Sequence, residues 1–166
     1  MEILALDHIY LSVSDMRVSE PFYDRVMQLL GFLKGDKQIG GDPHAHYFNR
    51  VLQLSIRPAK SSAAHDAYAP GLHHLCLQLP TRADVDEAAA ALLKAGVSAT
   101  EPKLYPEYNP EYYATFFTDP DGIRLELMNR TSYRDGLVNS WDQFETFLNP
   151  VAELLARKAA QADETK

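Results

Sequence analysis

The chain has 166 residues, of which 46% are hydrophobic and 23% charged, and its formal net charge is −7. This is a globular composition, sufficient for one domain or two small modules. The acidic balance argues against a nucleic-acid partner, because phosphate binding requires a basic surface. No apolar run approaches the roughly 20 residues that cross a bilayer, so we expect no membrane partner.

The compartment is predicted from two features. The single cysteine, Cys76, excludes an intramolecular disulfide and fits a reducing environment. The first strand-like pattern has no basic segment and apolar signal core before it. Both features predict a cytoplasmic protein.

The first third of the chain predicts a strand, a helix and three further strands. Residues 5–13 alternate apolar and polar side chains, as a strand with one buried face does. A helix is predicted from Ser14 or Asp15, either of which can cap it, to about Leu30, where Gly31 ends it. Three more strands follow, within residues 32–37, 45–48 and 51–56. We assign residues 1–62 to a first module.

The same order of elements starts again after a polar, alanine-rich linker at 58–70. Residues 72–79 predict a strand and residues 81–95 an alanine-rich helix. Three strands are then expected at 97–100, 113–118 and 123–128, the last two joined by the turn Asp119-Pro120-Asp121-Gly122. We assign residues 70–130 to a second module and 131–166 to a C-terminal helical extension.

This internal repeat predicts the fold class and a groove. The class is α+β, with two tandem βαβββ modules that form one curved, partly closed mixed sheet. Apolar strand faces pack on the helices, and the polar faces line a shared groove. Four side chains occupy corresponding places on those polar faces: His8, Gln53, His74 and Glu126.

Four features carry a resemblance to a known family. The internal repeat, the strand that contains His8, the stretch Gly71-Leu72-His73-His74-Leu75, and Phe117 to Leu127 around the Asp-Pro-Asp-Gly turn resemble the vicinal oxygen chelate superfamily. Its members include glyoxalase I, fosfomycin-resistance proteins, extradiol dioxygenases, methylmalonyl-CoA epimerase and bleomycin-resistance proteins. The resemblance covers roughly residues 5–130.

The resemblance implies a metal site and a mode of action. It assigns ligation of a divalent ion (Fe, Mn, Ni, Zn or Co) to His8, His74 and Glu126. Two imidazoles and a carboxylate suit such an ion and leave positions open for the oxygens of a small-molecule substrate. The resemblance also implies a homodimer, sometimes with modules exchanged between chains.

The fourth position, Gln53, departs from many glyoxalases, which carry a glutamate there. Its carbonyl oxygen can ligate a metal, but the amide cannot take a proton from carbon, and the alternative role is to hydrogen-bond a ligand. Another base is then needed: Glu107, Glu111 or a tyrosine of the loop 105–113. We select Tyr113 as the catalytic tyrosine beside Glu126.

Several functions stay open at this point. The resemblance favours a metal-dependent enzyme, either a glyoxalase-like lyase or isomerase or an extradiol-like dioxygenase, and thiol addition to an epoxide is a further reaction of the superfamily. The alternative is a non-catalytic drug-binding protein of the bleomycin-resistance type. For His44 and His46, we expect exposed surface histidines rather than a second metal site.

Overall fold

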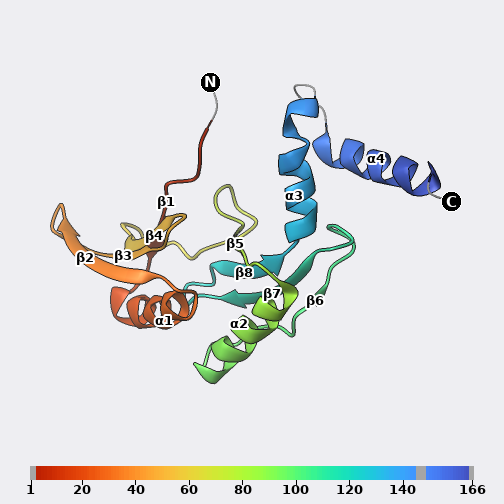
Figure 1. Ribbon diagram of the computed structural model, residues 1–166. Helices are drawn as coiled ribbons and strands as arrows, with labels where there is room; N and C mark the ends of the chain where they lie inside the picture. The colour runs from red at the N-terminus through yellow and green to blue at the C-terminus, as the bar shows by residue number, and fades with distance from the viewer. Residues whose placement is uncertain (1–2, 145–148, 165–166) are drawn as a thin grey trace.

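The computed structural model describes residues 3–144 and 149–164 and contains two four-stranded sheets with their helices (Figure 1). The α+β class and the tandem βαβββ modules are confirmed. The first module contains β1 (His8–Val13), α1 (Met16–Leu29), β2 (Leu33–Ile39), β3 (Asp42–Phe48) and β4 (Gln53–Pro58). The second contains β5 (His74–Gln78), α2 (Arg82–Lys94), β6 (Lys103–Leu104), β7 (Tyr113–Thr118) and β8 (Arg124–Asn129).

The two sheets have the same strand order. The first sheet runs β1-β4-β3-β2 and the second β5-β8-β7-β6, so the first and last strands of each module are parallel neighbours. The first strand of each module, β1 or β5, is therefore an edge strand with one partner. In the second module, residues 97–100 contribute one isolated bridge, Ala99 with Phe117, in place of the expected strand.

Local chemistry fixes where the helices begin and end. The Asp15 side chain accepts the backbone N–H of Arg17 and caps α1, and Gly31 follows the helix at a φ of 76° that a glycine adopts without strain. Helix α2 starts with a capping box between Thr81 and Asp84. Both helix boundaries agree with the sequence pattern to within a few residues.

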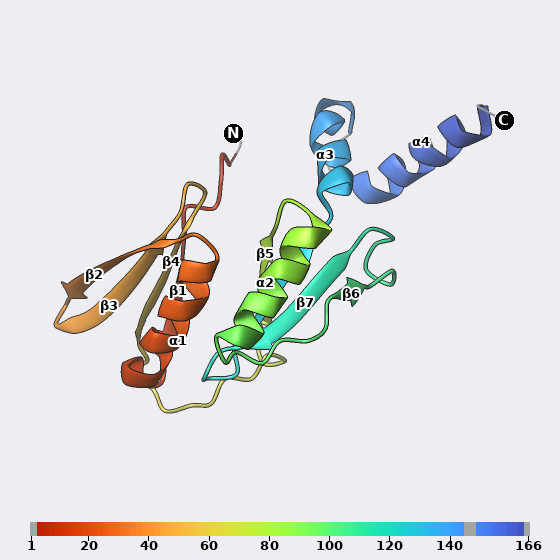
Figure 2. The ribbon, with the colours of Figure 1, turned by 60° about the horizontal axis from the view of Figure 1, so that its bottom comes forward.

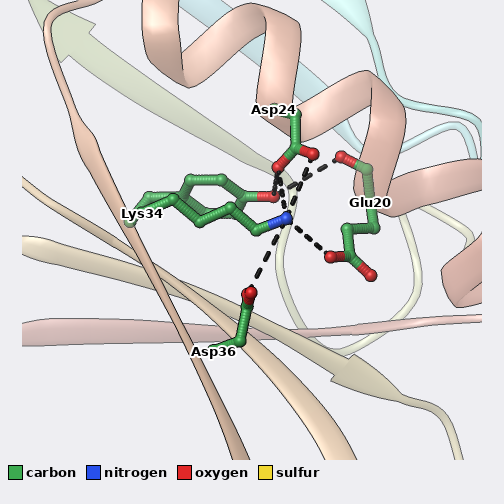
Figure 3. Close-up of polar contacts among 5 residues, drawn as sticks. Glu20, Asp24, Lys34 and Asp36 are labelled. Atoms are coloured by element: carbon green, nitrogen blue, oxygen red, sulfur yellow. Dashed lines mark hydrogen bonds and ion pairs between the residues drawn. The ribbon is translucent and has the colours of Figure 1, made fainter.

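An ion-pair cluster ties the edge strand β2 to α1. The Lys34 ammonium lies 2.6 Å from Glu20 and 2.9 Å from Asp24, both on α1, and 3.7 Å from Asp36 (Figure 3). Burial alone would lower the pKa of Lys34, but the hydrogen bonds to Glu20 and Asp24 outweigh it and raise that pKa. This lysine therefore stays charged across the physiological range.

The modules share one hydrophobic core, although their sheets are separate. Helices α1 and α2 lie on the same side of the molecule and contact each other (Figure 2). A buried hydrogen bond of 2.9 Å runs from the Tyr23 hydroxyl on α1 to Asp119 in the turn before β8. Within the described residues no strand of the first sheet pairs with a strand of the second, so the single continuous sheet that we expected is divided into two.

Beyond β8 the described residues are mostly helical. Helix α3 (Thr131–Asn139), a short 3-10 turn η1 (Trp141–Gln143) and helix α4 (Pro150–Glu164) extend past the second module (Figure 1). Tyr133, Leu137 and Leu154 form a small separate core between them. Residues 145–148 and 165–166 of the predicted extension lie outside the described part of the chain. None of the described helices combines the length and apolar character needed to cross a membrane.

Candidate functional site

The second module brings His74 and Glu126 together. They lie on the neighbouring parallel strands β5 and β8, and His74 Nε2 is 3.3 Å from Glu126 Oε2. The Glu126 side chain is only 3% exposed, whereas that of His74 is 36% exposed. A nearly buried carboxylate thus faces a partly exposed imidazole ring.

Each of these two side chains is held by a further partner. The Tyr112 hydroxyl donates a 2.7 Å hydrogen bond to Glu126 Oε1. His74 Nδ1 lies 2.7 Å from His73 Nδ1, so one ring donates and the other accepts. When His74 is the donor through Nδ1, its Nε2 carries the lone pair that faces Glu126.

The groups around Glu126 are partly buried. Burial raises the pKa of the Tyr112 hydroxyl, and the hydrogen bond to Glu126 raises it further. Burial, helped by the nearby Glu126 charge, also raises the pKa of the Cys76 thiol to about 12. The Arg130 guanidinium lies 5.7 Å from the centre of the Tyr112 ring and covers this tyrosine. Tyr112 and Cys76 therefore stay protonated at neutral pH.

The first module brings His8 and Gln53 together. They are directly paired across the parallel strands β1 and β4. The His8 side chain is 52% exposed, and its Nδ1 lies 2.8 Å from Asp7 Oδ2. The Gln53 amide nitrogen donates to Ser55 Oγ at 2.6 Å and lies 3.2 Å from His46 Nδ1. These contacts use the amide nitrogen, which leaves the carbonyl oxygen of Gln53 as its ligand atom.

The two pairs do not meet within the described chain. Across residues 3–144 and 149–164, no three His, Cys, Asp or Glu side chains come together as a metal site. Figures 1 and 2 show why: β1 and β4 belong to one sheet, and β5 and β8 to the other. Each module therefore presents one half of the predicted ligand set.

The structure places Tyr113 on the helix side of its sheet. Its hydroxyl donates 2.7 Å to Asp86 on α2, whereas the preceding Tyr112 reaches Glu126. The pairing of Phe116 with Glu126 across β7 and β8 explains the difference, because even-numbered positions near β7 share the face of Glu126. This register follows from the Asp-Pro-Asp-Gly hairpin, so counting outward from that turn could have identified Tyr112.

The expectation that His44 and His46 are surface residues is wrong. They are 5% and 8% exposed, respectively. Both lie on the sheet face that carries His8, with ring centres 5.9 Å apart, and Tyr10 packs edge-on against each of them. The alternation along β3 placed them on that face, but side chains that contact them come from β1 and β4 and leave no signal in the local sequence.

Fold and site together define a tandem βαβββ protein whose modules each carry a histidine on the first strand and an amide or carboxylate on the last. The family model described as "Glyoxalase/Bleomycin resistance protein/Dioxygenase superfamily" matches residues 5–127. The chain belongs to this superfamily, which confirms the resemblance to vicinal oxygen chelate proteins.

Individual relatives are more distant. The chain is 28% identical over 129 residues to the uncharacterized protein YqjT of Bacillus subtilis, covering 74% of this chain and 97% of that one. It is 27% identical over 128 residues to the metallothiol transferase FosB of Bacillus licheniformis, covering 76% and 75%. A crystal structure of a glyoxylase/bleomycin resistance protein/dioxygenase domain from Frankia sp. EAN1pec has a TM-score of 0.64 at 23% identity, covering 77% and 98%.

Proposed function

We propose that the protein is a metal-dependent enzyme that binds a divalent ion through His8, His74 and Glu126, with Gln53 as a fourth ligand. Its substrate is a small molecule whose neighbouring oxygens chelate the ion. The single observation that carries this proposal is the pairing of Nε2 of the partly exposed His74 ring with the nearly buried Glu126 carboxylate, 3.3 Å apart.

That spacing suits two ligands of one ion. Ligands about 2.1 Å from a metal are roughly 3.0 Å apart in an octahedral site and 3.4 Å apart in a tetrahedral one. The donor set also fits, since imidazole and carboxylate together suit Fe, Mn, Ni, Zn and Co. Tyr112 and His73 supply the outer hydrogen bonds that orient metal ligands in proteins.

A bound ion would act as a Lewis acid and stabilise negative charge that develops on a substrate oxygen. The protein's own groups set the conditions for that chemistry. Tyr112 orients the Glu126 carboxylate through its hydrogen bond, and the burial of this carboxylate limits its contact with solvent. The base must come from elsewhere than Gln53, because an amide takes no proton from carbon.

Two chains are needed to complete the site. In each module the histidine stands on an edge strand, β1 or β5, and the second ligand stands on the strand beside it. Edge strands present unpaired backbone groups and tend to associate. If the β1 edge of one copy lies against the β5 edge of another, all four ligands face one another. We therefore propose a homodimer with two such sites related by symmetry.

The type of reaction remains a choice among the chemistries of the superfamily. The glyoxalase-like lyase or isomerase reaction and the dioxygenase reaction both use a chelated substrate. The similarity to a metallothiol transferase adds thiol transfer as a second candidate. The metal that the protein retains selects the first assays: iron favours dioxygenase assays, nickel, zinc or cobalt favour isomerase and lyase assays, and manganese favours fosfomycin modification.

The first test is metal content, measured by mass spectrometry on untagged protein purified without chelators. About one transition metal per chain is expected in the wild type. The variants His8→Ala and Glu126→Ala should lose it, and His65→Ala, a histidine in the linker, should retain it. A wild-type protein that contains no metal and takes none up on reconstitution would contradict the proposal.

Mixing the two inactive variants tests whether the site spans two chains. A dimer of one His8→Ala chain and one Glu126→Ala chain has one site with both changes and one intact site. Random exchange after co-refolding should therefore restore metal to about a quarter of all sites. A site built within one chain would give no recovery, so an empty mixture would overturn the two-chain assembly while leaving the metal ligands unaffected.

A non-catalytic drug-binding protein is the alternative function. Calorimetry with bleomycin as the probe, on metal-stripped and metal-loaded protein, separates the two functions. We expect no tight binding to the metal-stripped protein. Undiminished tight binding after removal of the metal would favour sequestration over catalysis.

A further inference from the structure

His44 is a buried polar side chain that has no hydrogen-bond partner among the described residues. It is 5% exposed, and neither ring nitrogen has a hydrogen-bond partner. A neutral imidazole always carries one N–H donor and one lone pair. A buried donor without an acceptor is costly, so an occupant that offers an oxygen atom to this ring is favoured.

A second unmet donor lies on the neighbouring strand. The pairing of Ala45 with Ile56 puts His44 opposite Arg57 on β4. The Nε of Arg57 is also buried without a partner, while its terminal nitrogen donates 2.9 Å to Asp42. Two adjacent side chains, one an imidazole and one a guanidinium, thus have donors with no acceptor.

Charged side chains lie on both sides of His44. The Asp42 carboxylate is shared by two cations, Arg57 at 2.9 Å and Lys60 at 2.6 Å. On the other side, Lys37 of β2 is paired directly with His44. Asp36, the acidic residue of β2, lies near the Lys34 ammonium of the cluster in Figure 3. Lys37 is thus the neighbour of His44 on β2, Asp42 is held by two cations, and the carboxylates of Glu20 and Asp36, which line a pocket together with Lys37 and His44, lie against Lys34.

This cluster continues into the first half of the metal site. Tyr10 contacts both His44 and His8 through ring edges, with centres 5.8 Å and 5.6 Å apart. His46 lies 2.8 Å from Ser55 and 3.2 Å from the Gln53 amide nitrogen. A molecule with one end at His8 and Gln53 therefore has His44 further along the same sheet face.

From these contacts we infer that His44 and Arg57 form a subsite for an oxyanion, a carboxylate or phosphate group of the substrate. This inference rests on the proposed function in one respect: it takes the oxyanion to be part of the molecule that the metal ion binds. Guanidinium and imidazole N–H groups are the donors that bind carboxylate and phosphate oxygens most strongly. The substrate would therefore bind in one orientation, with its chelating oxygens at the ion and its anionic end at His44.

The test is a titration of metal-free protein, followed through the histidine ring resonances by ¹⁵N NMR. Inorganic phosphate and acetate are the two probes, and sodium chloride at equal ionic strength is the control. We expect saturable shifts of the His44 and His46 rings with at least one probe and none with chloride. A response to phosphate alone assigns a phosphate group, and a response to acetate alone assigns a carboxylate.

Three variants locate the site. His44→Phe and Arg57→Met each remove one unmet donor and should weaken binding at least tenfold, measured at His46. Lys60→Met removes a nearby cation without an unmet donor and should weaken binding no more than threefold. The use of two donor variants keeps the test valid if one of them fails to fold. No saturable shift, or equal binding by both donor variants and wild type, would overturn the inference.

Metal uptake by the same variants separates the two proposals. His44→Phe should retain the wild-type metal content, because His44 is outside the ligand set. Metal binding without oxyanion binding would overturn the subsite alone. Oxyanion binding in a protein that takes up no metal would support the subsite and contradict the proposed metal function.

Discussion

The adjacent tyrosines Tyr112 and Tyr113 offer the sharpest test of how the site is held. Tyr112→Phe removes only the hydroxyl that donates 2.7 Å to Glu126 Oε1. The Glu126 side chain is 3% exposed, so water has little room to replace that bond. Loss of such an outer-shell partner typically reduces metal affinity about 10- to 100-fold, which corresponds to roughly 1.4–2.8 kcal/mol. We expect a decrease in this range.

Tyr113→Phe is the matched control for this change. Its hydroxyl donates to Asp86 on the helix side of the sheet, so its removal should leave metal affinity unchanged. Competition with a chromophoric chelator measures both affinities on the same scale. Wild-type affinity in Tyr112→Phe, or an equal loss in Tyr113→Phe, would refute the reasoning. A large drop in turnover confined to Tyr113→Phe would instead support the catalytic role that the sequence suggested for Tyr113.

Two further predictions concern stability and reactivity. Tyr23→Phe should lower the free energy of unfolding by about 1–3 kcal/mol, because the Asp119 carboxylate, 5% exposed, loses its link to the first module. Urea titration measures the free energy of unfolding. The control is Tyr47→Phe, which should cost less than about 1 kcal/mol because its partner Asp24 is 41% exposed. Equal losses in the two variants would contradict the role of burial. In metal-free protein the Cys76 thiol, with a pKa of about 12, should react with iodoacetamide at pH 8 roughly a thousandfold more slowly than in urea-unfolded protein. Comparable rates in the two states would show that this thiol is not enclosed.

The fold could be predicted because its signals are local. Period-two alternation marked the strands around His8 and His74, and capping residues marked both long helices. The repeat then gave the topology. The division into two sheets could not be predicted, because whether two edge strands pair depends on how the modules pack. In the structure α1 and α2 meet, and the strand edges β1 and β5 remain unpaired with each other.

For the candidate site, too, local patterns predicted some features and missed others. Strand parity was enough to place His74 with Glu126, and His8 with Gln53, on the polar faces. It was not enough to distinguish Tyr112 from Tyr113, since that choice depends on the register of a hairpin across which Phe116 meets Glu126. The partners of His73 and the burial of His44 were also beyond local patterns, because they arise from contacts between side chains whose positions only the folded sheet defines.

The proposed ligand pairs of the two modules differ in how well their side chains are ordered without an ion. Glu126 is nearly buried, and both it and His74 have a hydrogen-bond partner that orients them. His8 is half exposed on an edge strand, and its hydrogen-bond partner Asp7 is itself 94% exposed. If the proposed two-chain site forms, His8 becomes ordered only when the site assembles. An ion that binds only the assembled form would then stabilise that form by mass action, so we predict that metal binding and dimer formation are coupled and that the loss of either weakens the other.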